Sequence, residues 1–259
     1  MALFIDTDIR MIPELARYES SIIDVANTEG IDLAAKLDVA KSEIGLELER
    51  FFASLISYDP ALFWRPTLLS KLTMGNVVFS DALKQWQVCR TIAVTYRDAY
   101  HRQLNSRYQA QYAEFTRLAE NAQSNCLDLG VGIVFNPIPA ASPPVATVPG
   151  GPVTAGGWFL SASWTGANGA EGAPGPTAQY AAPTGIAMAV TSGNPPSNVT
   201  GWNIYAGQTE STMGLQNDVP ISVGSAWNLP ANGFRTGRVP GTGQRHDQLL
   251  QRRRILRRG

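Results

Sequence analysis

The chain has 259 residues, 44% of them hydrophobic and 16% charged, and its formal net charge is zero. A chain of this length buries a sizeable core without disulfides or metals. Its composition excludes a disordered acidic or polybasic protein and a membrane-spanning one, so we expect a soluble, folded protein with no membrane contact.

The charges are unevenly spread along the chain. Residues 1–129 carry 13 Lys or Arg against 17 Asp or Glu, whereas residues 235–259 carry eight Arg against the single acid Asp247. The start MALFIDTDIR has acidic residues where a secretory signal needs a basic stretch and then an apolar run. The sequence therefore predicts a cytoplasmic protein with a basic C-terminus.

The first half of the chain has the periodicity of helices. Apolar residues recur at steps of three or four from Pro13 until Gly30, which predicts one amphipathic helix. A second apolar stripe runs from Leu33 to Leu55 and is expected to end before Asp59-Pro60. Residues 59–79 hold two prolines and a glycine among apolar residues, so we expect a packed loop with short turns.

Two more helices are predicted after residue 80. Ser80-Asp81 is typical of an N-terminal cap for a helix that runs to about Leu104, and a fourth helix follows Asn105-Ser106. Both are rich in Tyr and Arg, which bury an apolar stem and expose a polar tip. We interpret this stripe as a helix-packing surface rather than as a nucleic-acid platform, with packing between subunits as its extension.

The composition changes between Gly130 and Pro240. This segment holds 14 of the chain's 17 prolines, five charged residues and no lysine, a combination that disfavours helices. Short strand patterns alternate with turn-forming runs and predict a small antiparallel β-sandwich. The patterns are GWFLSASW (157–164), GIAMAVT (185–191), VTGWNIYA (199–206) and VPISV (219–223), followed by Ala226-Trp227.

These patterns predict an α+β fold with two domains. We expect an antiparallel helical bundle over residues 1–129 and a Pro/Gly-rich linker over 130–152. A β-sandwich over 153–240 and an Arg-rich tail over 241–259 follow, the tail being detached from the sandwich by Gly241 and Gly243.

The tail GTGQRHDQLLQRRRILRRG is the sharpest feature of the sequence. Leu249 and Leu256 lie one heptad apart, so a short helix would place both on one side with arginines around them. Such a helix is marginal in water and is expected to order only against a partner. The candidate docking residues are Arg245, Leu249, Leu250, Arg252, Arg253, Arg254, Ile255, Leu256, Arg257 and Arg258.

Three interpretations of the tail stay open at this point. Its guanidinium groups can pair with carboxylates on a protein partner, and four aliphatic residues among the charges favour such docking. The same arginines can neutralise phosphates, which predicts salt-dependent nucleic-acid binding. The third interpretation is an inert tail that keeps the protein soluble.

No arrangement of residues in the sequence predicts catalysis, a cofactor or a metal site. The two histidines, His101 and His246, lie in a predicted helix and in the tail, and we expect both to be packing or surface residues. Cys89 and Cys126 belong to no CxxC pair and are expected to be free thiols. GxGxxG after a strand, GxxxxGK[ST] and HExxH are all absent. We therefore do not expect an enzyme.

Two segments carry a resemblance to a known family. The run ELARYESSIIDVANTEGIDLAAKLDVAKSEIGLELERF resembles the helical core of tailed-bacteriophage head-to-tail adaptors, the connector or head-completion proteins that form a ring beneath the portal. The run GWNIYAGQTESTMGLQNDVPISVGSAW (201–227) resembles the end of a fibronectin type III or immunoglobulin-like module of phage structural proteins. The resemblance implies a structural protein of the virion neck, assembled in the host cytoplasm, with an inserted Ig-like domain.

The resemblance also implies partners. Adaptors of this family form a homo-oligomeric ring, usually of twelve copies, between the portal protein and a tail-side nozzle or tail-tube protein. The genomic DNA passes through their channel without specific binding. A C-terminal extension docks on the portal, and QRRRILRRG matches it in character. The β-domain between bundle and tail departs from the family pattern.

Two alternatives belong to other functional classes. One is an Ig-like carbohydrate- or receptor-binding module of a phage fibre or attachment protein, in which Trp158, Trp164, Trp202 and Trp227 hold a carbohydrate. Because side chains alternate along a strand, we expect most of these tryptophans to lie in the core instead. The other is a nucleic-acid-packaging protein that acts through its tail.

Overall fold

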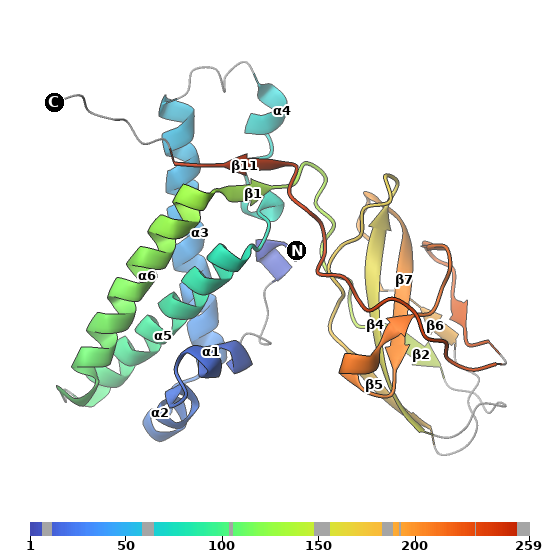
Figure 1. Ribbon diagram of the computed structural model, residues 1–259, viewed down its shortest axis with the longest axis horizontal. Helices are drawn as coiled ribbons and strands as arrows, with labels where there is room; N and C mark the ends of the chain where they lie inside the picture. The colour runs from blue at the N-terminus through green and yellow to red at the C-terminus, as the bar shows by residue number, and fades with distance from the viewer. Residues whose placement is uncertain are drawn as a thin grey trace. The chain divides into compact units, whose positions relative to one another are not determined.

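The computed structural model describes residues 1–6, 12–58, 65–103, 106–147, 156–182, 189–191, 193–230 and 232–252 (Figure 1). The chain divides into two compact units. The helical unit comprises Thr7–Phe135 and His246–Gly259, and the β unit comprises Met1–Asp6 and Asn136–Arg245. The predicted α+β class is confirmed, because six described α-helices are followed by antiparallel sheets.

Among the described residues, three long helices and three short ones belong to the helical unit. α5 packs against both α3 and α6, and α1 and α2 also contact α5 (Figure 1). None of the helices in the described part of the chain has the length and apolar character needed to cross a bilayer. The helices are α1 (Ile12–Tyr18), α2 (Ile22–Glu29), α3 (Leu33–Tyr58), α4 (Pro66–Leu69), α5 (Asp81–Gln103) and α6 (Gln109–Leu129).

The single helix predicted from Pro13 to Gly30 is wrong, because the chain breaks between α1 and α2. The Glu19 carboxylate accepts hydrogen bonds from the main-chain N–H and the hydroxyl of Ser21, at 3.2 and 2.6 Å. Such local side-chain bonds compete with helical backbone bonds. The predicted end is correct: Gly30 adopts a left-handed conformation at φ 62° and its N–H returns to carbonyls of α2.

The Tyr and Arg stripe of α5 and α6 packs helices together, as predicted. Tyr96 is buried and stacks on Phe115 of α6, with ring centroids 5.8 Å apart. Arg90 of α5 binds the carboxylate of Glu43 on α3 at 2.5 Å. Arg102 donates to the main-chain carbonyls of Glu29 and Gly30 and so caps the C-terminal end of α2.

The packed loop predicted over 59–79 is confirmed where the structure describes it, from residue 65 onward. It contains α4 and a 3₁₀ turn, Met74–Asn76. Leu68, Val77 and Val78 from this segment are buried. Residues 59–64 lie outside the described residues.

Two antiparallel sheets form the β unit. The larger has the order β5-β4-β7-β8, with β9 pairing another stretch of β7, and the smaller has the order β10-β6-β2. β4 and β7 are the long central strands (Figure 1). The bounds are β2 (Val145–Thr147), β4 (Gly156–Gly166), β5 (Ala178–Ala182), β6 (Ala189–Thr191), β7 (Val199–Gly207), β8 (Gly214–Leu215), β9 (Ile221–Ser222) and β10 (Trp227–Asn228).

Side-chain alternation gives β4 and β7 an apolar face and a polar face, and both are buried. Leu160, Ala162 and Trp164 of β4 share one core with Trp202 and Ile204 of β7. The intervening residues are polar yet also buried. They are Ser161, Ser163, Thr165, Asn203 and Tyr205.

Glu171 makes burial of the polar face possible. Its Oε1 accepts hydrogen bonds from the hydroxyls of Ser163 and Tyr205 and from the side-chain amide of Asn203, and its Oε2 accepts one from Arg238. Burial alone would raise the pKa of this carboxyl group, but the four hydrogen bonds lower it overall. Glu171 is therefore a charged structural residue of the β unit.

The predicted linker and the predicted start of the tail both need correction. The segment 130–152 is not a simple linker, because Val131–Ile133 and Val145–Thr147 are strands and Ile138 is buried in the core of the β unit. Residues 148–152 lie outside the described residues. The tail does not begin at Gly241, because the β unit extends to Arg245. The buried Gln244 accepts the N–H of Ile138 and donates to the carbonyl of Asn136.

Candidate partner-binding site

The beginning of the predicted docking segment is a strand on the helical unit. β11 (Gln248–Leu250) pairs antiparallel with β1 (Val131–Ile133), with Leu250 opposite Val131. β1 directly follows α6, so β11 lies at the C-terminal end of that helix (Figure 1). The predicted helix is therefore wrong for Leu249 and Leu250, and residues 253–259 lie outside the described residues.

A backbone partner explains why this segment is a strand. An isolated helix of this length forms too few internal hydrogen bonds to be stable in water. β1 already bonds on one side to the segment after α4, where the N–H of Val78 donates to the carbonyl of Gly132 at 2.9 Å. β11 also pairs with β1, so the backbone N–H and C=O groups of the tail bond to a neighbouring strand. A short isolated helix would not be held in this way by the rest of the protein.

Two glycines allow the close approach of the tail. A Cβ at Gly132 would stand 2.9 Å from the Cβ of His246, closer than real Cβ contacts come. Gly130 has φ +112°, which side-chain-bearing residues rarely adopt, and a Cβ there would stand 3.0 Å from the Cγ of Gln251. The run Gly-Val-Gly therefore makes room for the tail.

The tail also caps helix α6. The last carbonyls of an α-helix have no partner within the helix. The main-chain N–H of Arg252 donates to the carbonyl of Leu127 at 2.8 Å, and the side-chain amide of Gln251 donates to that of Leu129 at 3.2 Å. The positive Arg252 at this negative end of the helix dipole adds a favourable charge interaction.

Asp247 fixes the start of the docked segment. Its N–H donates to the carbonyl of Ile133 at 2.9 Å, and its Oδ2 accepts the N–H of Phe135 at 2.7 Å. In the sequence Asp247 stands out only as the single acid among arginines. Its side chain in fact holds the end of β1 and the start of β11 together.

The described docking candidates do not form one cluster. Arg245 belongs to the β unit and is exposed, whereas Leu249, Leu250 and Arg252 belong to the helical unit. Leu250 is 7% exposed, Leu249 is 46% exposed and Arg252 is exposed. The other six, Arg253, Arg254, Ile255, Leu256, Arg257 and Arg258, lie outside the described residues. Within the described part of the tail, the buried Leu250 thus differs from the exposed Leu249 and Arg252.

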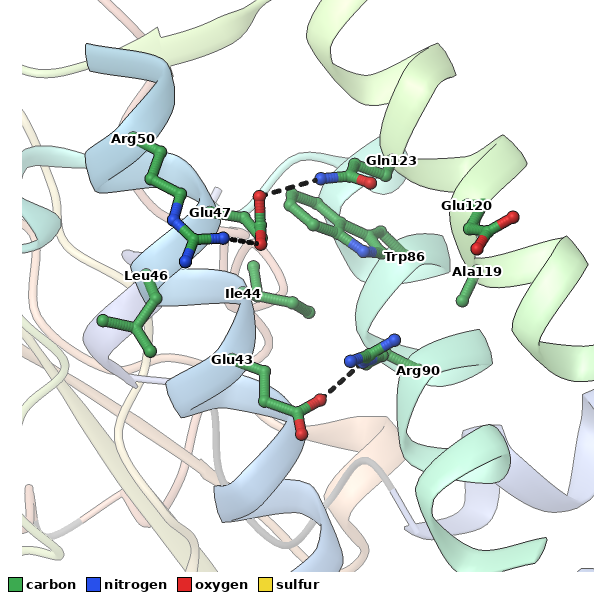
Figure 2. Close-up of a pocket in the computed structure, with 10 residues that line it drawn as sticks. All are labelled: Glu43, Ile44, Leu46, Glu47, Arg50, Trp86, Arg90, Ala119, Glu120 and Gln123. Carbon is green, nitrogen blue, oxygen red and sulfur yellow. Dashed lines mark hydrogen bonds and ion pairs between the residues drawn. The ribbon is translucent and has the colours of Figure 1, made fainter. Parts of the chain in front are cut away.

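A polar hollow of about 330 Å³ lies on the helical unit (Figure 2). Trp86 and Arg90 of α5 stand between α3 on one side and α6 on the other. Ten residues line it: Glu43, Ile44, Leu46, Glu47 and Arg50 from α3, Trp86 and Arg90 from α5, and Ala119, Glu120 and Gln123 from α6. Because these residues come from three helices, no pattern within one helix predicts that they meet.

The acidic side chains of the hollow are unequally paired. Glu43 binds Arg90 at 2.5 Å and Arg97 at 3.6 Å. Glu47 binds Arg50 at 2.7 Å and accepts a bond from Gln123 at 3.5 Å. Glu120 has no polar partner among the described residues, nor does the indole N–H of Trp86, whose residue is only 3% exposed.

The two cysteines are buried and the two histidines are exposed. Both cysteines are buried free thiols, and burial raises the pKa of Cys89 and raises that of Cys126 to about 12. His101 is exposed on α5 beside the ring of Tyr100, and His246 is exposed in the tail. Within the described ranges no three His, Cys, Asp or Glu gather in a way that could hold a metal ion.

The tryptophans of the β unit are mostly core residues, as predicted. Trp164, Trp202 and Trp227 are buried, and Trp158 is partly buried against the ring of Phe234 at a centroid distance of 4.1 Å. A carbohydrate platform needs exposed aromatic faces, which the three buried tryptophans do not offer.

Comparison of the chain with protein-family models, with curated proteins and with solved structures found no match.

Proposed function

We propose that this chain is a structural virion protein, a head-to-tail adaptor that forms a ring between a phage portal and the tail. In this proposal the helical units pack side by side around the channel and the C-terminal segment docks on the portal protein. The tail-side neighbour is a nozzle or tail-tube protein. The chain acts through assembly and carries out no reaction.

The observation that best supports the proposal is the anchoring of the tail. The main-chain bond from Arg252 to Leu127 and the pairing of β11 with β1 hold the chain on the helical unit up to residue 252. The following RRILRRG thus starts from a defined point at the end of α6. A short cationic and aliphatic segment that starts from a rigid body loses less entropy on binding than one on a free tail.

Ring assembly makes a weak contact sufficient. Each segment need contribute only about as much as a micromolar contact, roughly 8 kcal/mol at most. Once one segment of a ring has bound, the others meet their sites at high effective concentration. Arginine suits such a contact because its planar fork pairs with carboxylates while the aliphatic neighbours bury apolar surface.

The charge of the helical half fits a channel that DNA passes without sticking. Residues 1–129 carry more acidic than basic residues. Many copies around an axis would give a negative potential along the genome path. This part of the proposal would be contradicted if the full chain bound DNA tightly and the chain without residues 253–259 bound it equally tightly.

Removal of residues 253–259 tests the proposal. The shortened chain keeps β11 and Arg252, so we expect it to fold as the full chain does but to lose binding to purified portal rings. A matched variant, Arg253→Gln with Arg254→Gln, Arg257→Gln and Arg258→Gln, keeps the length and the aliphatic residues. We expect it to bind at least tenfold more weakly, and portal binding at full strength by the shortened chain would overturn the docking role.

The same variants distinguish binding of the tail to nucleic acid from its docking on a protein. If the tail bound phosphates, the affinity of the full chain for DNA would fall steeply with salt concentration, and the four Arg→Gln changes would flatten that slope. We expect no such slope, because the proposal assigns the tail to a protein partner.

A further inference from the structure

The hollow between α3, α5 and α6 has unmet hydrogen-bonding capacity. It is lined by the indole N–H of Trp86 and by the carboxylate of Glu120, an exposed residue, and neither group has a polar partner among the described residues. Figure 2 shows Trp86 between the α3 side chains and the α6 side chains Glu120 and Gln123. The indole N–H of Trp86 is not sealed from solvent, so water can bond to it, and an occupant of the hollow can replace that water as the acceptor.

The carboxylate of Glu47 can also bind an incoming cation, because its ion pair with Arg50 stabilises the protein little. The ion pair of Glu47 with Arg50 joins two residues one helical turn apart, and the Arg50 side chain is 75% exposed. Exposed pairs of this kind contribute little to stability, so an incoming cation can replace Arg50. The hollow can therefore offer Glu47 from α3 and Glu120 from α6.

The rim of the hollow adds an apolar contact. Leu46 lines the hollow and is 58% exposed, whereas Ile44, which also lines it, is only 1% exposed. An occupant that carries both cations and aliphatic side chains matches this mixture. A basic peptide also brings main-chain carbonyls, which the indole N–H of Trp86 can use, and guanidinium donors for the carboxylates.

We propose that the hollow binds residues 253–259 of the same chain. This segment, RRILRRG, supplies four arginines and two aliphatic residues. The proposal does not depend on the adaptor function. If that function holds, the hollow keeps the segment until a partner draws it out.

The reach of the segment is sufficient. Arg252 is held at the carbonyl of Leu127, and Glu120, Gln123 and Leu127 share one face of α6 because they are spaced by three and four residues. Glu120 is about 10 Å from Leu127 along the helix axis. Seven extended residues span about 23 Å, so the segment can fold back along α6. Attachment to the same chain gives it a high effective concentration at the hollow.

Paramagnetic labelling of the full chain tests the proposal. A nitroxide on Gly259→Cys should broaden the NMR signal of the Trp86 indole N–H, which is assigned by its loss in Trp86→Phe. Glu120→Lys reverses the charge in the hollow and should abolish the broadening. Glu114→Lys makes the same change at an exposed position of α6 that does not line the hollow, and the broadening should persist.

Mixed samples identify the source of the segment. In a mixed sample, one chain carries the NMR isotope but no nitroxide, and the other carries the nitroxide but no isotope. Same-chain binding then predicts no broadening of the Trp86 signal. Broadening in the mixture would assign the segment to a neighbouring copy and overturn the proposal. An unbroadened Trp86 signal in the singly labelled chain would overturn it as well. Portal binding of the shortened chain is a separate readout, so the two proposals can fail independently.

Discussion

Arg252 donates its main-chain N–H to the carbonyl oxygen of Leu127 at 2.8 Å, and so joins the C-terminal segment to the end of α6 across 125 residues of sequence. Most of the β unit lies between these two residues in the chain. The helical unit is thus completed by a segment synthesised after the β unit. β11, the last strand of the helical unit, therefore pairs with β1 only after the β unit has been synthesised.

Gly132→Val should release the tail. The added Cβ would stand 2.9 Å from the Cβ of His246 and 3.4 Å from that of Val78, so β11 must shift. We expect a loss of about 1–3 kcal/mol and faster trypsin cleavage after the tail arginines. Gly45→Ala is the matched control: its Cβ meets nothing within 4 Å, and it should stabilise α3 by about 0.5–1 kcal/mol. Equal cleavage rates in both variants would contradict the β1–β11 pairing.

Leu250→Ala and Leu249→Ala should differ, although the two leucines are adjacent. Leu250 is buried on the helical unit, so its truncation should cost about 2–3 kcal/mol and speed hydrogen exchange of the amides in β1. Leu249 is 46% exposed, and its truncation should change the free energy of unfolding by less than about 0.5 kcal/mol. Similar exchange rates in the two variants would indicate that both leucines face the same environment.

Glu171 should make the β unit sensitive to acid. Burial opposes its ionisation, but four hydrogen bonds outweigh that effect and the pKa of Glu171 in the folded state lies below the ordinary 4.5. Its contribution to stability is therefore complete above pH 4.5 and is lost as the pH falls through the lower folded pKa. Thermal unfolding of the full chain from pH 6 to pH 3 measures this loss.

Glu171→Gln should remove that pH dependence and lower stability at neutral pH by about 1–3 kcal/mol, because charge-assisted bonds from Ser163, Tyr205 and Arg238 weaken. Glu210→Gln, the same change at an exposed residue, is the control and should leave the unfolding temperature unchanged. If Glu171→Gln still lost stability on acidification, the acid sensitivity would have to come from other carboxyl groups.

The native thiols should be inert. Burial raises the pKa of Cys89 and raises the pKa of Cys126 to about 12, so neither side chain is a thiolate at pH 8. We expect labelling by a thiol reagent to be at least a hundredfold slower in the folded chain than in denaturant. Fast labelling of the folded chain would show that the core around α5 and α6 opens readily.

The sequence predicted local structure better than long-range pairing. The apolar stripe of α3 and the alternation of Leu160, Ala162 and Trp164 determine which faces are buried, and these elements were predicted nearly to their ends. The break at Ser21 was missed because the local bonds from the N–H and hydroxyl of Ser21 to the Glu19 carboxylate leave no mark in the periodicity.

The candidate site was harder to predict because its partners are distant in sequence. Gly130 and Gly132 looked like linker residues, yet each makes room for a tail residue more than a hundred positions away. Leu249 suggested a heptad because helical spacing was considered without a strand partner. The hollow combines Glu47, Trp86 and Glu120 from three helices, and no spacing within one helix predicts that they meet.

The most direct test of the adaptor proposal is an electron cryo-microscopy reconstruction of the virion neck. We expect a ring of these chains against the portal, with β11 on β1 and the segment after Arg252 in contact with portal subunits. A neck without this chain, or a ring whose C-terminal segments project into solvent, would contradict the proposal.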